Sequence, residues 1–83
     1  MKTDNEIKEY IISLWARSWE LLDEIGVLAI KLNESLNQIE EAEIKNKINE
    51  LKYLRHTKIG AANEFIKFFG FIKTVDKRKL VLK

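Results

Sequence analysis

The chain has 83 residues, a formal net charge of +2 and no cysteine. This length supports one small domain, and the lack of cysteine excludes a disulfide framework and a thiolate metal site. The longest apolar run, residues 25–30 with Gly26 included, is far too short to span a membrane. The first residues lack the apolar segment of a signal peptide. We therefore expect a single-domain, cytoplasmic protein without a membrane span.

The two halves of the chain carry opposite charge. Residues 1–43 contain four Lys/Arg and ten Asp/Glu, whereas residues 44–83 contain eleven and three, so the halves carry −6 and +8. Two interpretations follow. Oppositely charged helices attract each other in an antiparallel pair, although each exposed ion pair adds only ~0–1 kcal/mol. Alternatively, the basic half also meets an anionic partner. We prefer the first interpretation.

Apolar residues at steps of three and four predict a first helix over about residues 4–40. Thr3 or Asp4 is the expected N-cap, with Glu6 in the first turn. The apolar line comprises Ile7, Ile11, Leu14, Leu21, Leu22, Ile25, Leu28, Leu32, Leu36 and Ile39, and Ser18 interrupts it. A second apolar edge beside it comprises Ile12, Trp15, Trp19 and Ile30. So wide an apolar arc requires more than one neighbouring helix.

The helical phase breaks between Ile39 and Ile44, which predicts a turn at about residues 40–43. The alternative is a turn at residues 33–37, because residues 35–38, Ser-Leu-Asn-Gln, have the form of a capping box. A second helix is expected over about residues 43–75. Its apolar line comprises Ile44, Ile48, Leu51, Leu54, Ile59, Ala62, Phe65, Phe69 and Ile72. Residues 76–83 are expected to form a frayed last turn or a short basic tail.

Two glycines lie inside the predicted helices, at positions 26 and 60, equally far from residue 43. Each costs a helix ~1 kcal/mol relative to Ala. Either they lie at the same level of a hairpin and allow close approach, or they break the chain into four short helices. Two unbroken helices of roughly 33 residues would be ~50 Å long and would leave much apolar surface wet. We therefore expect an all-α fold, a long antiparallel helical hairpin that pairs into a homodimeric four-helix bundle.

Several aromatic side chains are candidates for a protein interface, first with a second copy and then with an unknown protein partner. These residues are Trp15, Trp19, Tyr53, Phe68 and Phe71. Tyr53, Phe68 and Phe71 lie off the main apolar line of the second helix. Because burial of an aromatic ring contributes ~1.5–3 kcal/mol, rings left outside the core are expected to find a partner.

Basic residues in the second half are candidates for nucleic-acid contacts. Those of the second helix are Lys45, Lys52, His56 and Lys67, with Asn49 and Asn63 between them. Those that follow it are Lys73, Lys77, Arg78 and Lys79. The arrangement resembles small dimeric RNA-binding hairpins of plasmid systems, the Rop type, in architecture only.

The sequence contains no recognisable catalytic or metal-binding motif. His56 is the only histidine and lies among cations, so no zinc site is expected. The pair Glu20-x-x-Asp23 resembles the magnesium-binding pairs of helical pyrophosphatases of the MazG kind, but the second motif is missing and Glu20 and Glu24 point away from the apolar line. We expect no enzyme activity, no cofactor and no metal. A metal-dependent helical hydrolase is the weakest alternative.

We interpret the protein as a small, non-enzymatic adaptor or regulator that acts through protein–protein contacts. The abundance of Lys, Ile and Asn is typical of a virus, phage or plasmid with an AT-rich genome. Small helical proteins that protect bacteria from their own bacteriocins have similar size and charge, which makes an immunity-type role conceivable. The alternative is a nucleic-acid-binding regulator that uses the basic face of the second helix.

Overall fold

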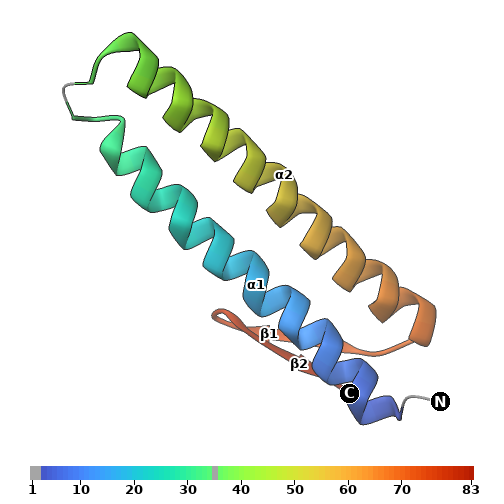
Figure 1. Ribbon diagram of the computed structural model, residues 1–83. Helices are drawn as coiled ribbons and strands as arrows, with labels where there is room; N and C mark the ends of the chain where they lie inside the picture. Colours follow the sequence, from blue (N-terminus) through green and yellow to red (C-terminus); the bar gives the residue numbers. More distant parts are fainter. Residues whose placement is uncertain (1–2, 35) are drawn as a thin grey trace.

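The computed structural model describes residues 3–34 and 36–83. Helix α1 (Asp4–Lys31) packs against helix α2 (Gln38–Phe69), and a β-hairpin of strands β1 (Lys73–Asp76) and β2 (Lys79–Leu82) follows (Figure 1). The molecule measures 51 × 23 × 16 Å. Its radius of gyration of 16.3 Å exceeds the ~12 Å of a compact chain of this length. The prediction of two long, packed helices is confirmed, whereas the all-α class needs correction because of the small sheet.

The start of α1 follows the sequence prediction. Thr3 is the N-cap, and its side-chain oxygen accepts a hydrogen bond from the Glu6 amide at 3.2 Å. Asp4 and Glu6 place negative charge in the first turn, and Lys31 places positive charge in the last turn. Both charges interact favourably with the helix dipole and stabilise α1.

The connection between the helices lies before the predicted turn at residues 40–43. Asn37 caps α2: its side-chain oxygen accepts from the Glu40 amide at 2.8 Å, and its amide nitrogen donates to the Glu40 carboxylate at 2.8 Å. Residues 40–43 therefore lie in the first turns of α2. Ile39 continues the apolar phase of α1 only by coincidence, since 72% of its surface is exposed. Ser35, the first residue of the alternative capping box, lies outside the described residues.

Neither internal glycine breaks a helix. Gly26 and Gly60 lie within continuous α1 and α2, and no neighbouring heavy atom lies within 4 Å of the position that a Cβ would take. Close helix approach therefore does not explain them. Ser18 of α1 lies opposite Arg55 of α2, and Tyr10 of α1 lies opposite Phe65 of α2. In this register Gly26 and Gly60 lie at different levels along the helical pair.

The end of α2 differs most from the sequence prediction, which extended the helix to residue 75. Gly70 adopts a left-handed conformation, with φ of 72°. The Phe71 amide donates to the Ile66 carbonyl and the Gly70 amide to the Lys67 carbonyl, at 3.1 and 3.3 Å, which is the Schellman pattern of a helix end. The β-branched residues Ile72, Thr74 and Val75 then favour extended backbone.

The β-hairpin replaces the predicted basic tail. Its register pairs Lys73 with Leu82 and Asp76 with Lys79, so residues 77 and 78 form a two-residue loop. Lys77 has a φ of 57°, a conformation that usually selects Gly, Asn or Asp in such loops. The sequence therefore carries no conventional turn signal at this point.

The core consists of two clusters along the helical pair. The cluster at the hairpin end comprises Ile11, Leu14, Ala62, Ile66, Leu80 and Leu82. The cluster at the end near the helix connection comprises Leu21, Ile25, Ile48 and Leu51. Between them lies buried Ser18, whose hydroxyl donates to the Trp15 carbonyl and whose carbonyl accepts from Arg55 Nε. We call this level the polar layer.

We predict that Leu80→Ala lowers the free energy of unfolding by about 2–4 kcal/mol, because Leu80 is 3% exposed and its truncation leaves a cavity. Val81→Ala is the matched control, since Val81 is 39% exposed on the other face of β2. Urea denaturation followed by circular dichroism measures both. Equal losses in the two variants would contradict docking of this face of the hairpin.

Candidate functional site

The tip of the β-hairpin is attached to one side of α1 by three side chains at steps of four, Trp15, Trp19 and Asp23. Trp15 Nε1 donates to the Arg78 carbonyl at 3.1 Å. The Arg78 guanidinium lies 4.9 Å from the Trp19 ring centroid, within cation–π range. Arg78 Nη1 also lies 3.0 and 2.8 Å from the two Asp23 carboxylate oxygens. Arg78 is therefore an internal anchor.

Further contacts connect this attachment to α2. The Lys73 ammonium lies 5.3 Å from the Trp15 ring centroid and 3.3 Å from Asn63 Oδ1. The Arg55 guanidinium lies 5.7 Å from the Trp19 ring centroid. Both tryptophans, predicted to lie at a protein interface, are thus half-buried and in contact with their own chain. The spacing of Trp15, Trp19 and Asp23 is the sequence signal that could have indicated a docked segment.

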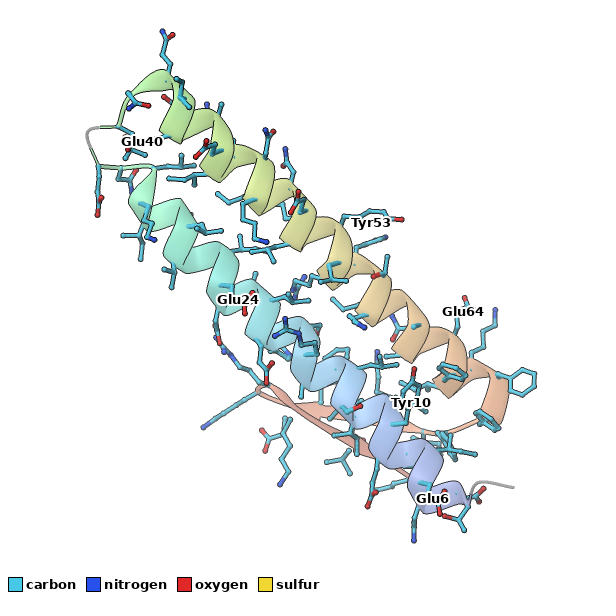
Figure 2. The ribbon with its side chains drawn as sticks, in the orientation of Figure 1. Glu6, Tyr10, Glu24, Glu40, Tyr53 and Glu64 are labelled. Atoms are coloured by element: carbon cyan, nitrogen blue, oxygen red, sulfur yellow. The ribbon has the colours of Figure 1, made fainter. Side chains whose placement is uncertain are left out.

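Within residues 3–34 and 36–83, no segment covers the opposite flank of the helical pair, which we call the open side. On α2 its residues recur at steps of three and four: Lys47, Leu51, Leu54, Lys58, Ala61, Phe65 and Phe68. Tyr10 joins it from α1, with its ring centroid 5.7 Å from that of Phe65. In Figure 2, Tyr10 lies on the side of α1 that faces α2, whereas the hairpin lies on the other side of α1.

Two apolar grooves lie on the open side, one toward each end. A groove of 320 Å³ is lined by Ala61, Glu64, Phe65 and Phe68. A groove of 290 Å³ is lined by Glu24, Val27, Leu28, Lys47 and Leu51. The first is bordered by the most exposed aromatic ring of the described residues, Phe68, at 81%. The second is bordered by Val27, at 56%.

The aromatic residues near Gly70 form a continuous cluster. Phe69 contacts three other rings: Phe65 at 6.3 Å, Phe68 at 5.0 Å and Phe71 at 5.8 Å between centroids. Phe71 packs on the core with the Lys8 ammonium 5.2 Å from its ring, so it is only partly available to a partner. Phe68 is fully available.

Tyr53, the remaining predicted interface residue, lies apart from this cluster. It is 73% exposed and projects from α2 away from α1 (Figure 2). The structure thus divides the five predicted interface aromatics. Trp15 and Trp19 hold the hairpin, Phe68 and Phe71 belong to one cluster, and Tyr53 stands by itself.

The predicted nucleic-acid residues fall on α2 and the hairpin. Lys45 pairs with Glu41 at 2.8 Å and lines, with Lys52, a 380 Å³ groove between the helices. Lys73 and Arg78 make the internal contacts given above. The others are exposed, and no carboxylate pairs with them within the described part of the chain. These residues are Lys52, His56, Lys67, Lys77 and Lys79.

The three acidic residues in the second half of α1, Glu20, Asp23 and Glu24, pair with arginines. Arg17 Nη1 lies 3.0 Å from a Glu20 oxygen and 3.6 Å from a Glu24 oxygen. The hydrogen bond with Glu20 raises the pKa of Arg17 above its usual value. Asp23 pairs with Arg78. Within residues 3–34 and 36–83, no three His, Asp or Glu side chains gather as potential metal ligands. Neither described helix is long and apolar enough to cross a bilayer.

The chain matches no protein-family model, and no curated protein or solved structure is significantly similar to it.

We predict that Arg78→Gln lowers the free energy of unfolding by about 0.5–1 kcal/mol, because it removes the ion pair with Asp23 and the contact with Trp19. Urea unfolding followed by tryptophan fluorescence measures the loss, and the native emission is expected to change because Trp19 loses the nearer of its two cations and keeps only Arg55. Lys79→Gln, which alters an exposed neighbour, is the control. A similar loss in both variants would contradict the anchoring role of Arg78.

Proposed function

We propose that the protein is a non-enzymatic binding module that acts through protein–protein contacts and pairs with a second copy through its open side. A single observation carries the proposal: the hairpin covers one flank of the helical pair and leaves Phe68 81% exposed on the other. Burial of one aromatic side chain contributes about 1.5–3 kcal/mol. A cluster of exposed rings beside an apolar groove is typical of a protein-binding surface.

An antiparallel homodimer accounts for both grooves of the open side. A two-fold axis across this side would place the Phe65 and Phe68 end of each copy against the Val27 and Leu28 groove of the other. Each contact would then occur twice, as in an isologous interface. The result would be an antiparallel four-helix bundle with the hairpins on its outer surfaces.

The dimensions of the molecule suit this arrangement. The two larger dimensions of the molecule, 51 and 23 Å, bound a face of roughly 1,000 Å², which is large enough to contain the ~800 Å² per partner of a standard interface. The charged residues in the middle of the open side include both signs, the cations Arg17 and Lys58 and the carboxylate Glu24, and Arg17 lies 3.6 Å from Glu24. This mixture permits complementary pairs across the axis. A small adaptor, regulator or immunity-type protein would fit such a dimer.

We predict that Phe68→Glu converts the dimer to a monomer, because it introduces a charge into an apolar contact that occurs twice. Size-exclusion chromatography with light scattering measures the mass, and circular dichroism checks helicity. Tyr53→Glu is the matched control, an equally exposed aromatic of α2 away from the open side, and is expected to remain dimeric.

Two results would overturn the proposed pairing. One is a wild-type chain that stays monomeric at high micromolar concentration. The other is loss of the dimer in Tyr53→Glu but not in Phe68→Glu, which would move the interface to the outer face of α2.

A further inference from the structure

A second flank of α2 has a composition that neither the core nor the open side explains. Its positions follow the core line one residue later, at steps of three and four, and we call them the basic stripe. They are Lys45, Asn49, Lys52, His56, Gly60, Asn63 and Lys67. The stripe contains no carboxylate and no large apolar side chain, although both kinds of residue occur on the other flanks of the same helix.

The positive charge of the stripe is poorly compensated. Lys45 pairs with Glu41 at 2.8 Å. No carboxylate pairs with Lys52 or Lys67 among the described residues. Three acidic residues of α1 pair with other cations, Asp23 with Arg78 and both Glu20 and Glu24 with Arg17. The predicted neutralisation of basic α2 by acidic α1 therefore does not reach the stripe.

Gly60 is independent evidence that the basic stripe is a binding surface. A glycine inside a helix costs about 1 kcal/mol relative to Ala. No neighbouring heavy atom lies within 4 Å of the position that its Cβ would take, so internal packing does not require it. It follows His56 by four residues and precedes Asn63 by three, in the middle of the stripe. A missing side chain at that point lets a ligand approach the helix backbone closely.

The β-hairpin extends the stripe. The Lys73 ammonium lies 3.3 Å from Asn63 Oδ1, which places a cation of β1 directly beside the polar residues of α2. This contact brings together the two groups of basic residues, on the second helix and after it.

We propose that the basic stripe binds the phosphate backbone of double-stranded nucleic acid. Charge complementarity favours this ligand, since each Lys that neutralises a phosphate releases a counterion. The stripe spans residues 45–67, which is about 33 Å at 1.5 Å per residue, close to the ~34 Å of one duplex turn. It contains no Phe, Tyr or Trp side chain on which unpaired bases could stack, and His56 is its single imidazole, so a duplex suits it better than a single strand.

This binding goes beyond the proposed protein contact and uses a different flank of α2. An antiparallel dimer formed through the open side would leave both basic stripes exposed. Loss of one interaction therefore leaves the other measurable.

The test measures fluorescence anisotropy of the full chain with duplexes of about 20 base pairs, of DNA and of RNA, and with single strands of the same sequence. We expect the chain to bind the duplex. The logarithm of the association constant is expected to fall linearly with the logarithm of the salt concentration, with a slope of about −3, which is about one unit for each of Lys45, Lys52 and Lys67. The triple variant K45Q/K52Q/K67Q is expected to flatten this slope and to weaken binding at low salt by tenfold or more. Binding of either duplex supports the proposal.

Two controls separate the stripe from general positive charge and from bulk. K47Q/K58Q removes cations of the same helix on the open side and is expected to lower duplex affinity much less than the triple variant. Gly60→Leu is expected to weaken duplex binding about fivefold while it preserves helicity, whereas Asn46→Leu, on the outer face of α2, leaves binding unchanged. Absence of salt-dependent duplex binding, a preference for single strands, or equal losses in stripe and control variants would overturn the proposal.

Discussion

Attachment of the β-hairpin to α1 determines which surfaces of this protein are covered and which are free. Two amphipathic helices alone cannot bury an apolar arc as wide as that of α1. Leu80 and Leu82 complete the core beside Ile11, and Trp15 and Trp19 receive the hairpin on the flank. The hairpin supplies a third layer only on one side and at one end of the pair. The open side and its exposed rings are the direct consequence of this one-sided cover.

Helix α2 presents three different surfaces because its residues follow three adjacent lines. The core line includes Ile48, Ala62 and Ile66. One residue later along the chain lies the basic stripe, and on the other flank lie the apolar and aromatic residues of the open side. A single helix can therefore separate two kinds of ligand chemistry on opposite flanks of its own diameter, which is about 10–12 Å with side chains. The basic residues of the second half of the chain thus make one flank of α2 positively charged, whereas its other flank is mainly apolar and aromatic.

The sequence predicted the features that depend on local periodicity and missed those that depend on single residues. The helical lines and the Thr3 cap were evident because repeated apolar spacing and a capping residue leave clear patterns. The turn was misplaced because exposed Ile39 continues the phase of α1, while the pair Asn37 and Glu40 carried the actual capping signal. The β-hairpin was missed because Lys77 occupies a turn position that usually selects glycine. The role of Arg78 as an anchor was hidden because it depends on contacts with α1 far away in the sequence.

The polar layer at Ser18 and Arg55 has a consequence for the internal motion of the molecule. It interrupts apolar contact between the two clusters, so neither cluster gains much from the other through direct packing. The cluster at the hairpin end is formed by three elements, α1, α2 and β2, whereas the cluster near the helix connection is formed by the two helices only. Local opening is less costly where fewer buried contacts must separate. We therefore expect the helix-connection end to open as a separate, less stable cooperative unit, whose amides exchange with solvent before those near the hairpin.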